Sequence, residues 1–126
     1  MGIEILIVDD EVEFADAFAE RLRLRGFTAH TASTGEQALQ IIDQGSAKVM
    51  VLDLKMPGMD GLEVLRRVKK THPEVEVIIL SGHGSEMDDA YGRNLGAFAY
   101  LRKPADIGDI LEAVKRAETL LASRSV

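Results

Sequence analysis

Cysteine and tryptophan are absent from this chain of 126 residues, and proline occurs only 3 times. Without cysteine the chain has neither disulfides nor thiolate metal sites, which agrees with the cytoplasmic location that we expect. No apolar run approaches membrane-spanning length, and no secretory signal opens the sequence, so we expect no membrane insertion. Basic residues number 15 against 21 acidic ones, giving a formal charge of −6. This balance argues against direct nucleic-acid binding by the chain.

The length and the hydrophobic content of 46% suit one domain with a substantial core. No internal repeat, low-complexity segment or interdomain linker is visible. We expect the domain to occupy residues 1–121 and residues 122–126 to form a loose tail.

Short apolar segments alternate five times with amphipathic helical patterns. The expected strands are residues 3–8, 27–31, 49–52, 75–80 and 96–101. A helix is expected after each, of which residues 86–95 have the thinnest apolar stripe. Right-handed crossovers then give an α/β sandwich of three layers, a five-stranded parallel sheet with helices on both faces.

Polar residues mark the expected helix starts. Asp10, Asp60 and Asp106 each stand where an N-cap is needed, and Ser33 begins a possible capping box. In the first helix, over residues 11–25, the spacing of Phe14 places it on the apolar stripe that faces the core.

The central stretch is residues 48–61, in which an apolar run ends on Asp53. Pro57 fixes φ and Gly58 permits a positive φ, so a turn follows. An apolar run of this kind predicts a strand buried on both faces, and open α/β sheets build their sites at the carboxyl ends of such strands. On this stretch alone, Asp53 is equally compatible with a site and with a simple loop cap.

Chemically useful side chains stand at the ends of four expected strands: Asp9 and Asp10, Asp53, Ser81 and Lys103. Parallel strands bring these to one edge of the sheet. Closely spaced carboxylates repel one another unless a cation intervenes, and hard oxygen ligands suit Mg²⁺. A metal beside a lysine and a hydroxyl stabilises a transferring phosphoryl group, and an exposed aspartate can be its nucleophile. The pattern predicts phosphoryl transfer onto a carboxylate.

Taken singly, each of these residues has a plainer explanation. The first acidic pair can be a helix cap with a surface charge, and Lys103 can be a solvated lysine. Ser81 has no base nearby in the sequence pattern to activate it as a nucleophile. His83 lies in a glycine-rich loop and can be a solvated loop residue. Tyr100 can be a half-buried aromatic residue of a strand. The functional interpretation depends on their coincidence at the strand ends.

Four segments resemble the receiver domains of bacterial two-component response regulators: Ile7–Asp10, Asp53–Gly61, Leu80–Gly82 and Gly96–Pro104. Their order and spacing match that family along essentially the whole chain. The segment after Leu80 and the one after Gly96 further resemble receivers of the nitrogen-regulator type.

The resemblance implies a flavodoxin-like strand order 2-1-3-4-5. It implies that Asp53 accepts a phosphoryl group from the phosphohistidine of a sensor histidine kinase or phosphotransfer protein. Asp10, Asp53 and the backbone carbonyl of Lys55 would bind Mg²⁺ directly, and Asp9 would act mainly through water. Such a domain catalyses only its own phosphorylation and dephosphorylation.

The resemblance also implies how the signal is passed on. Ser81 would hydrogen-bond the phosphoryl group, Lys103 would pair with it, and Tyr100 would be a switch aromatic that turns inward. The face made by the fourth helix, the fifth strand and the last helix would then change its partner affinity, and a homodimer is a family expectation. A cis peptide bond before Pro104 is suggested as well.

Three alternatives are weaker. An interaction module of receiver type that is never phosphorylated would not need the intact acids, Ser81 and Lys103. A Mg²⁺-dependent aspartyl phosphatase usually has a second acid two residues after its nucleophile, where this chain has Lys55. A flavodoxin would need hydroxyls and backbone donors, not acids, after its first strand. Lys55 itself is expected to alter the lifetime of an aspartyl phosphate.

Overall fold

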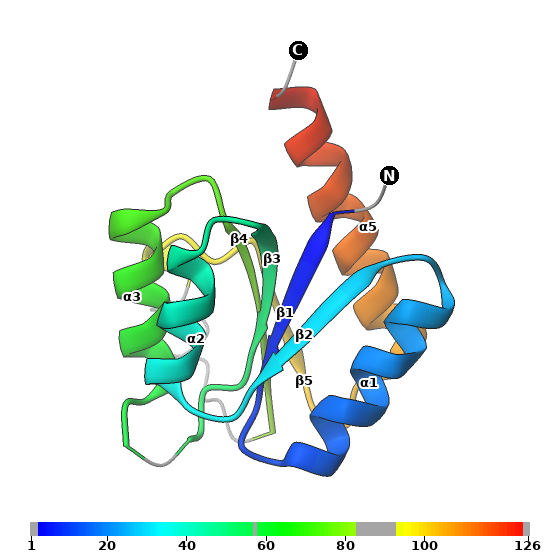
Figure 1. Ribbon diagram of the computed structural model, residues 1–126, viewed down its shortest axis with the longest axis horizontal. Coiled ribbons are helices and arrows are strands. Elements are labelled where there is room, and N and C mark those ends of the chain that lie inside the picture. The colour runs from blue at the N-terminus through cyan, green and yellow to red at the C-terminus, as the bar shows by residue number, and fades with distance from the viewer. Residues whose placement is uncertain (1–2, 57, 83–92, 125–126) are drawn as a thin grey trace.

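The computed structural model describes residues 3–56, 58–82 and 93–124, with Ser81 described by its backbone alone. Five parallel strands form one sheet in the order β2-β1-β3-β4-β5, which confirms the predicted architecture and strand order (Figure 1). The strands are β1 (Glu4–Val8), β2 (Thr28–Ala32), β3 (Ala47–Leu52), β4 (Glu76–Ser81) and β5 (Ala99–Arg102). The helices are α1 (Val12–Leu24), α2 (Gly35–Asp43), α3 (Gly61–Thr71) and α5 (Ile107–Arg124).

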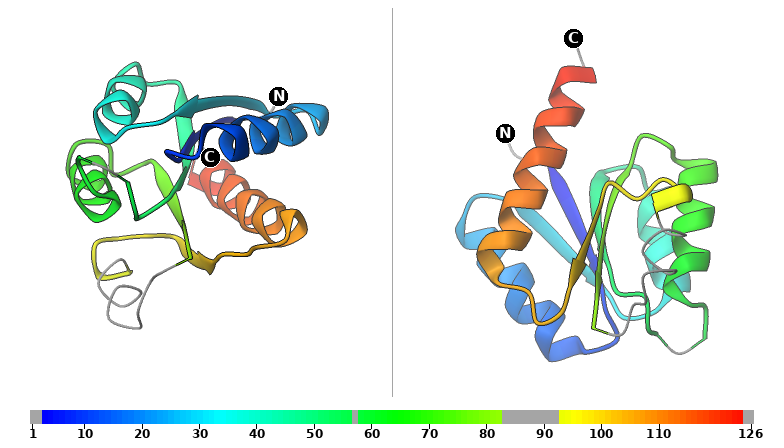
Figure 2. Two further views of the ribbon diagram at one scale, coloured as in Figure 1. Left: turned by 90° about the horizontal axis from the view of Figure 1, so that it is seen from below. Right: turned by 180° about the vertical axis from the view of Figure 1, so that it is seen from behind.

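Within the described residues, the four labelled helices cover both faces of the sheet. Helices α2 and α3 pack on one face, and α1 and α5 pack on the other (Figures 1 and 2). Successive strand residues alternate between these layers, so that Leu6 and Val8 face α2 and α3 while Ile5 and Ile7 face α1 and α5. The sheet is therefore buried on both sides, as the continuous apolar runs predict.

The position of each strand in the sheet follows its composition. In β3 every residue except Lys48 is buried, and β3 lies in the middle of the sheet. In β2, exposed Thr28 and His30 alternate with buried alanines, and β2 is an edge strand. The predicted central place of the strand before Asp53 is thus confirmed.

The helix caps agree only partly with the predictions. Asp60 caps α3 as expected, since its Oδ1 accepts a hydrogen bond from the Glu63 amide at 3.0 Å. Asp10 does not cap α1: the N-cap is Glu11, whose side chain makes no capping hydrogen bond. The cap of α2 is Thr34 instead of Ser33, because the Thr34 hydroxyl accepts from the backbone amide of the residue three positions on. Ser and Thr both cap well, so the sequence alone did not decide between neighbours.

Helix α5 begins after Asp106, whose Oδ1 accepts a hydrogen bond from the Gly108 amide at 3.2 Å. It continues to Arg124, so residues 122–124, which were expected to belong to the loose tail, are helical. Arg124 binds the buried carboxylate of Glu76 with an Nη1–Oε2 distance of 2.7 Å, which gives this last turn a partner on β4.

Two other expectations concern helical segments. The helix expected over residues 86–95 falls mainly outside the described residues, although residues 93 and 94 are helical. Phe14 was expected in the core but is 37% exposed, so that prediction is wrong. Within the described ranges, none of the helices combines the length and hydropathy needed to cross a bilayer.

Candidate functional site

The site lies at the carboxyl edge of the sheet, at the end opposite the free end of α5 (Figure 1). Asp9 directly follows β1, Asp53 directly follows β3, and Lys103 directly follows β5. The backbone continues the ladder by one step here, since the Asp53 amide donates to the Val8 carbonyl at 2.9 Å. Main-chain hydrogen bonding therefore fixes Asp53 beside the end of β1.

Three of the predicted acids come together at this edge. Asp9, Asp10 and Asp53 each offer a carboxylate oxygen, and these oxygens lie within 4.8 Å of one another. Asp9 and Asp53 are buried, being 2% and 6% exposed, whereas Asp10 is exposed. Two buried carboxylates and one exposed carboxylate at this spacing fit a divalent cation of the Mg²⁺ type, which takes a few protein oxygens and keeps its remaining waters.

Lys103 joins the acids from the other end of the chain. Its Nζ lies 3.0 Å from Asp9 Oδ2, 3.4 Å from Glu11 Oε1 and 3.9 Å from Asp53 Oδ2. The first is a good charge-assisted hydrogen bond, whereas the last is an ion pair too long for one. Lys103 thus stands beside Asp53 while Asp9 holds it.

Burial and charge perturb both central groups. Burial raises the pKa of Asp53, and the charges of Asp9 and Asp10 add to this effect; the backbone amide of Lys55 and the charge of Lys103 oppose it. Burial works to lower the pKa of Lys103, but the hydrogen bond with Asp9 and the surrounding carboxylates outweigh it and raise that pKa. The carboxylate therefore ionises at a cost that a bound cation would offset.

The remaining predicted site residues are placed to different degrees. The Lys55 amide donates to Asp53 Oδ1 at 3.3 Å, which puts the Lys55 backbone beside the acids. Ser81 is the last residue of β4, but its side chain lies outside the described residues. Tyr100 is 9% exposed and so already lies within the core. The peptide bond between Lys103 and Pro104 is cis, as suggested.

A cleft of about 680 Å³ opens above these groups. Asp10, Asp53, Lys55 and Lys103 line it, so the Asp53 carboxylate can be reached by a molecule that enters the cleft. The cleft is also lined by Phe14.

Glu11 and Phe14 are site residues that sequence reasoning missed. Glu11 had no signal beyond its place after two acids. Phe14 was hidden by its helical spacing, which suits a core residue equally well.

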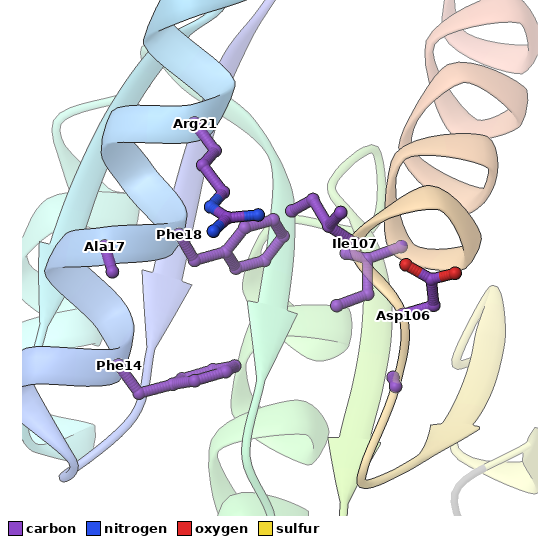
Figure 3. A pocket seen from close by; sticks show the side chains of 8 residues that line it. Phe14, Ala17, Phe18, Arg21, Asp106 and Ile107 are labelled. Atoms are coloured by element: carbon purple, nitrogen blue, oxygen red, sulfur yellow. The ribbon is translucent and has the colours of Figure 1, made fainter.

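A second, smaller hollow of about 360 Å³ adjoins the cleft between α1 and the start of α5. Figure 3 shows Phe14, Phe18 and Arg21 projecting from α1 toward Ile107 and Asp106 across this groove. Phe14 lines both the groove and the cleft.

Comparison with known proteins agrees with this geometry. The family profile described as the response regulator receiver domain matches residues 5–115 of the chain. This chain belongs to the response regulator receiver domain family. Receiver domains are phosphoacceptors of two-component signalling rather than conventional enzymes, and they interact with histidine kinases or phosphotransfer proteins.

Individual relatives cover the whole receiver domain. The chain is 36% identical over 116 residues to sporulation initiation phosphotransferase F of Bacillus subtilis, covering 92% of this chain and 94% of that protein. A CheY-like receiver domain structure from Methanospirillum hungatei superposes with a TM-score of 0.94 at 29% identity, covering 98% of this chain and 99% of the other. The receiver domain of NtrX from Brucella abortus gives a TM-score of 0.85 at 33% identity, covering 91% and 98% of the two chains.

Proposed function

We propose that Asp53 is the phosphoacceptor of this receiver domain. An oxygen of the Asp53 carboxylate attacks the phosphorus of a donor phosphohistidine, an O–P bond forms, and the P–N bond to the imidazole breaks. The product is an aspartyl phosphate and a histidine that takes up a proton. The single observation that supports this assignment is the position of Asp53: it is 6% exposed, lines the cleft, and lies close to both Lys103 and the other acids.

Mg²⁺ is the proposed cofactor. Asp10, Asp53 and the backbone carbonyl of Lys55 would hold it directly, with Asp9 acting mainly through water. The ion would neutralise the charge that gathers on the transferring phosphoryl oxygens. Asp9 has a second task in this proposal, because its Oδ2 already holds the Lys103 ammonium.

Lys103 and Ser81 are proposed to respond to the phosphoryl group. Phosphorylation adds roughly −1.5 to −2 charge and strong acceptor oxygens at Asp53. The Lys103 ammonium, now 3.9 Å from Asp53 Oδ2, has a short way to move toward that charge. Ser81 would hydrogen-bond the phosphoryl group, and Tyr100 would take part in the switch. The outcome is a population shift at the face that includes β5 and α5.

The proposed donor is a sensor histidine kinase or a phosphotransfer protein, and the proposed location is the cytoplasm, where such kinases meet ATP. Dimerisation through the β5 and α5 face remains a family expectation. Light scattering with and without a phosphoryl mimic tests it: a monomer mass in both conditions contradicts it. An unphosphorylated interaction module is the alternative that the following experiment addresses.

The test of the phosphoacceptor is intact mass spectrometry after incubation with acetyl phosphate and Mg²⁺. Wild type should gain one phosphoryl group, and Asp53→Ala should gain none. Asp109→Asn removes an exposed carboxylate from α5 and should behave like wild type. Omission of Mg²⁺ should abolish the adduct in wild type and in Asp109→Asn.

An adduct that persists in Asp53→Ala contradicts the assignment of the acceptor. Absence of any adduct in wild type calls for a Mg²⁺ titration followed by NMR chemical shifts of the Asp10 and Asp53 amides. If Mg²⁺ does not bind, the domain is the unphosphorylated module; if it binds, the cognate histidine donor is the next reagent to use.

Lys55 is proposed to tune the lifetime of the product, because it lines the cleft within two residues of the acceptor. We expect Lys55→Ala to change the rate at which purified aspartyl phosphate hydrolyses. An unchanged hydrolysis rate would remove Lys55 from the mechanism.

A further inference from the structure

Phe14 occupies an unexpected place for an apolar residue of an amphipathic helix. The residue is 37% exposed, although its spacing along α1 matches that of buried Phe18. The ring lies with its centroid 4.9 Å from the Lys103 Nζ. This distance is within the range at which the negative face of an aromatic ring attracts an ammonium group.

The ring completes a cage around Lys103 whose members come mainly from one side of the cleft. Asp9 Oδ2 and Glu11 Oε1 approach the ammonium at 3.0 and 3.4 Å, and both residues lie in the short loop between β1 and α1. Phe14 lies in the first turn of α1. This loop and the start of α1 thus supply two carboxylates and an aromatic face to Lys103, whereas Asp53 Oδ2 is 3.9 Å from its Nζ.

The aromatic face matters because lysine is otherwise a poorly fixed charge. Its four-carbon stem is flexible, and its ammonium is strongly hydrated and free to rotate. The Lys103 side chain is 21% exposed, so water still has access to it. A ring on one side of the ammonium excludes water there without using any of its three N–H donors, which remain available for Asp9, Glu11 and an incoming phosphoryl oxygen.

We propose that Phe14 is a positioning residue for phosphoryl transfer, which fixes the Lys103 ammonium beside Asp53 through its ring face. This inference rests on the proposed function of Asp53 and adds a residue to it. Phe14 touches neither the phosphoryl group nor the metal in this proposal; it acts through Lys103. Phe14 also lines the groove between α1 and α5. The same side chain would therefore both position Lys103 and form part of the wall of that groove.

The experiment compares one substitution that removes the aromatic ring with one that keeps it. Phe14→Leu keeps an apolar side chain and removes the aromatic face, whereas Phe14→Tyr keeps the face. Leu24→Ala changes another exposed apolar residue at the far end of α1, where it is 79% exposed, and serves as the matched control. All are assayed with acetyl phosphate and saturating Mg²⁺, so that no protein donor contacts α1.

We expect Phe14→Leu to lower the phosphorylation rate constant about 2- to 5-fold, the factor that corresponds to an exposed cation–π contact. Phe14→Tyr and Leu24→Ala should keep the wild-type rate. NMR of the lysine side chains supplies a second signal: the ring current should shift the ε-methylene protons of Lys103 upfield in wild type and Phe14→Tyr, and this shift should vanish in Phe14→Leu.

Equal rates for Phe14→Leu and wild type would overturn the proposal, as would a Phe14→Tyr protein that is as slow as Phe14→Leu. A slow Phe14→Leu protein whose Lys103 protons keep the wild-type shift would overturn it too, because the loss would then have another cause. Failure of the proposed function looks different, since the adduct would then persist in Asp53→Ala. That result removes the phosphoacceptor assignment whatever the ratio between the Phe14 variants.

Discussion

The start of α3 packs directly on the backbone next to Asp53, the proposed phosphoacceptor, and Gly61 makes this contact possible. The Gly61 amide donates to the Leu54 carbonyl at 3.0 Å. A Cβ built on Gly61 would lie 2.5 Å from the Asp53 carbonyl oxygen and 2.5 Å from Leu54 Cα. Both neighbours are main-chain atoms, which cannot rotate away as a long side chain can. We therefore predict that Gly61→Ala destabilises the domain and disturbs the site together.

The magnitude follows from the geometry. Ordinary contact begins near 3.4 Å, so the added carbon must displace backbone by about 1 Å. Overpacking of this kind costs about 1–3 kcal/mol, and we take the upper half because backbone has to move. The better helix propensity of alanine offsets about 0.5 kcal/mol or more of this loss in stability. The net loss should be about 2 kcal/mol, or roughly 6–10 °C in the melting temperature of a domain of this size.

The assay is urea denaturation followed by far-ultraviolet circular dichroism, with two glycine-to-alanine controls. Gly58 has φ of +79° and open space around it, so Gly58→Ala should cost about 1 kcal/mol through backbone strain alone. Gly108 has only ordinary contacts, so Gly108→Ala in α5 should be neutral or stabilising by about 0.5 kcal/mol. The reasoning is refuted if Gly61→Ala proves as stable as Gly58→Ala. Wild-type phosphorylation kinetics in Gly61→Ala would refute its link to the site.

Three further predictions concern the stability effects of single side chains. Thr34→Ala should cost about 1 kcal/mol in a urea titration and Ser33→Ala almost nothing; equal losses would contradict the observed cap. In metal-free buffer, Asp53→Asn should be more stable than wild type at pH 7, because burial raises the folded-state pKa of Asp53. The difference in stability between the two proteins should shrink as the pH falls toward 3.8. A difference that does not depend on pH in thermal melts would contradict this. The two arginines bonded to Glu63 lower its pKa from 4.5 to about 2. The stability that Glu63 contributes should therefore be present above pH 4.5 and lost as the pH falls toward 2. Thermal melts of Glu63→Gln should show no such loss.

The proposed metal site gives a prediction of its own. Mg²⁺ at ten times its dissociation constant should stabilise wild type by about 1.4 kcal/mol, because binding to the folded state alone adds RT ln(1 + [L]/Kd). The Asp10→Asn and Asp53→Asn variants should gain clearly less in the same thermal melts. An equal gain in wild type and variants would place the bound ion elsewhere.

The order of the elements and the position of Asp53 were predictable from sequence, because both depend on local patterns. Continuous apolar runs mark the buried strands, and Asp53 stands next to one of them whatever the rest of the chain does. Parallel strands must end at one edge, so the meeting of Asp9, Asp10, Asp53 and Lys103 followed from topology alone. The N-cap at Asp60 was predictable as well, because capping depends on neighbouring residues in the sequence.

Contacts between distant elements were decided by the tertiary structure. Phe14 has the spacing of a core residue, and only the placement of the α1 start beside the end of β5 turns its ring toward Lys103. Lys103 hydrogen-bonds Asp9, 94 residues away in the chain, and lies farther from Asp53, because of where β1, β3 and β5 end. Likewise the pairing of Glu76 with Arg124 depends on α5 running the full length of the sheet. Periodicity tells which face of a helix is apolar, but the position of that helix on the sheet determines what each side chain meets.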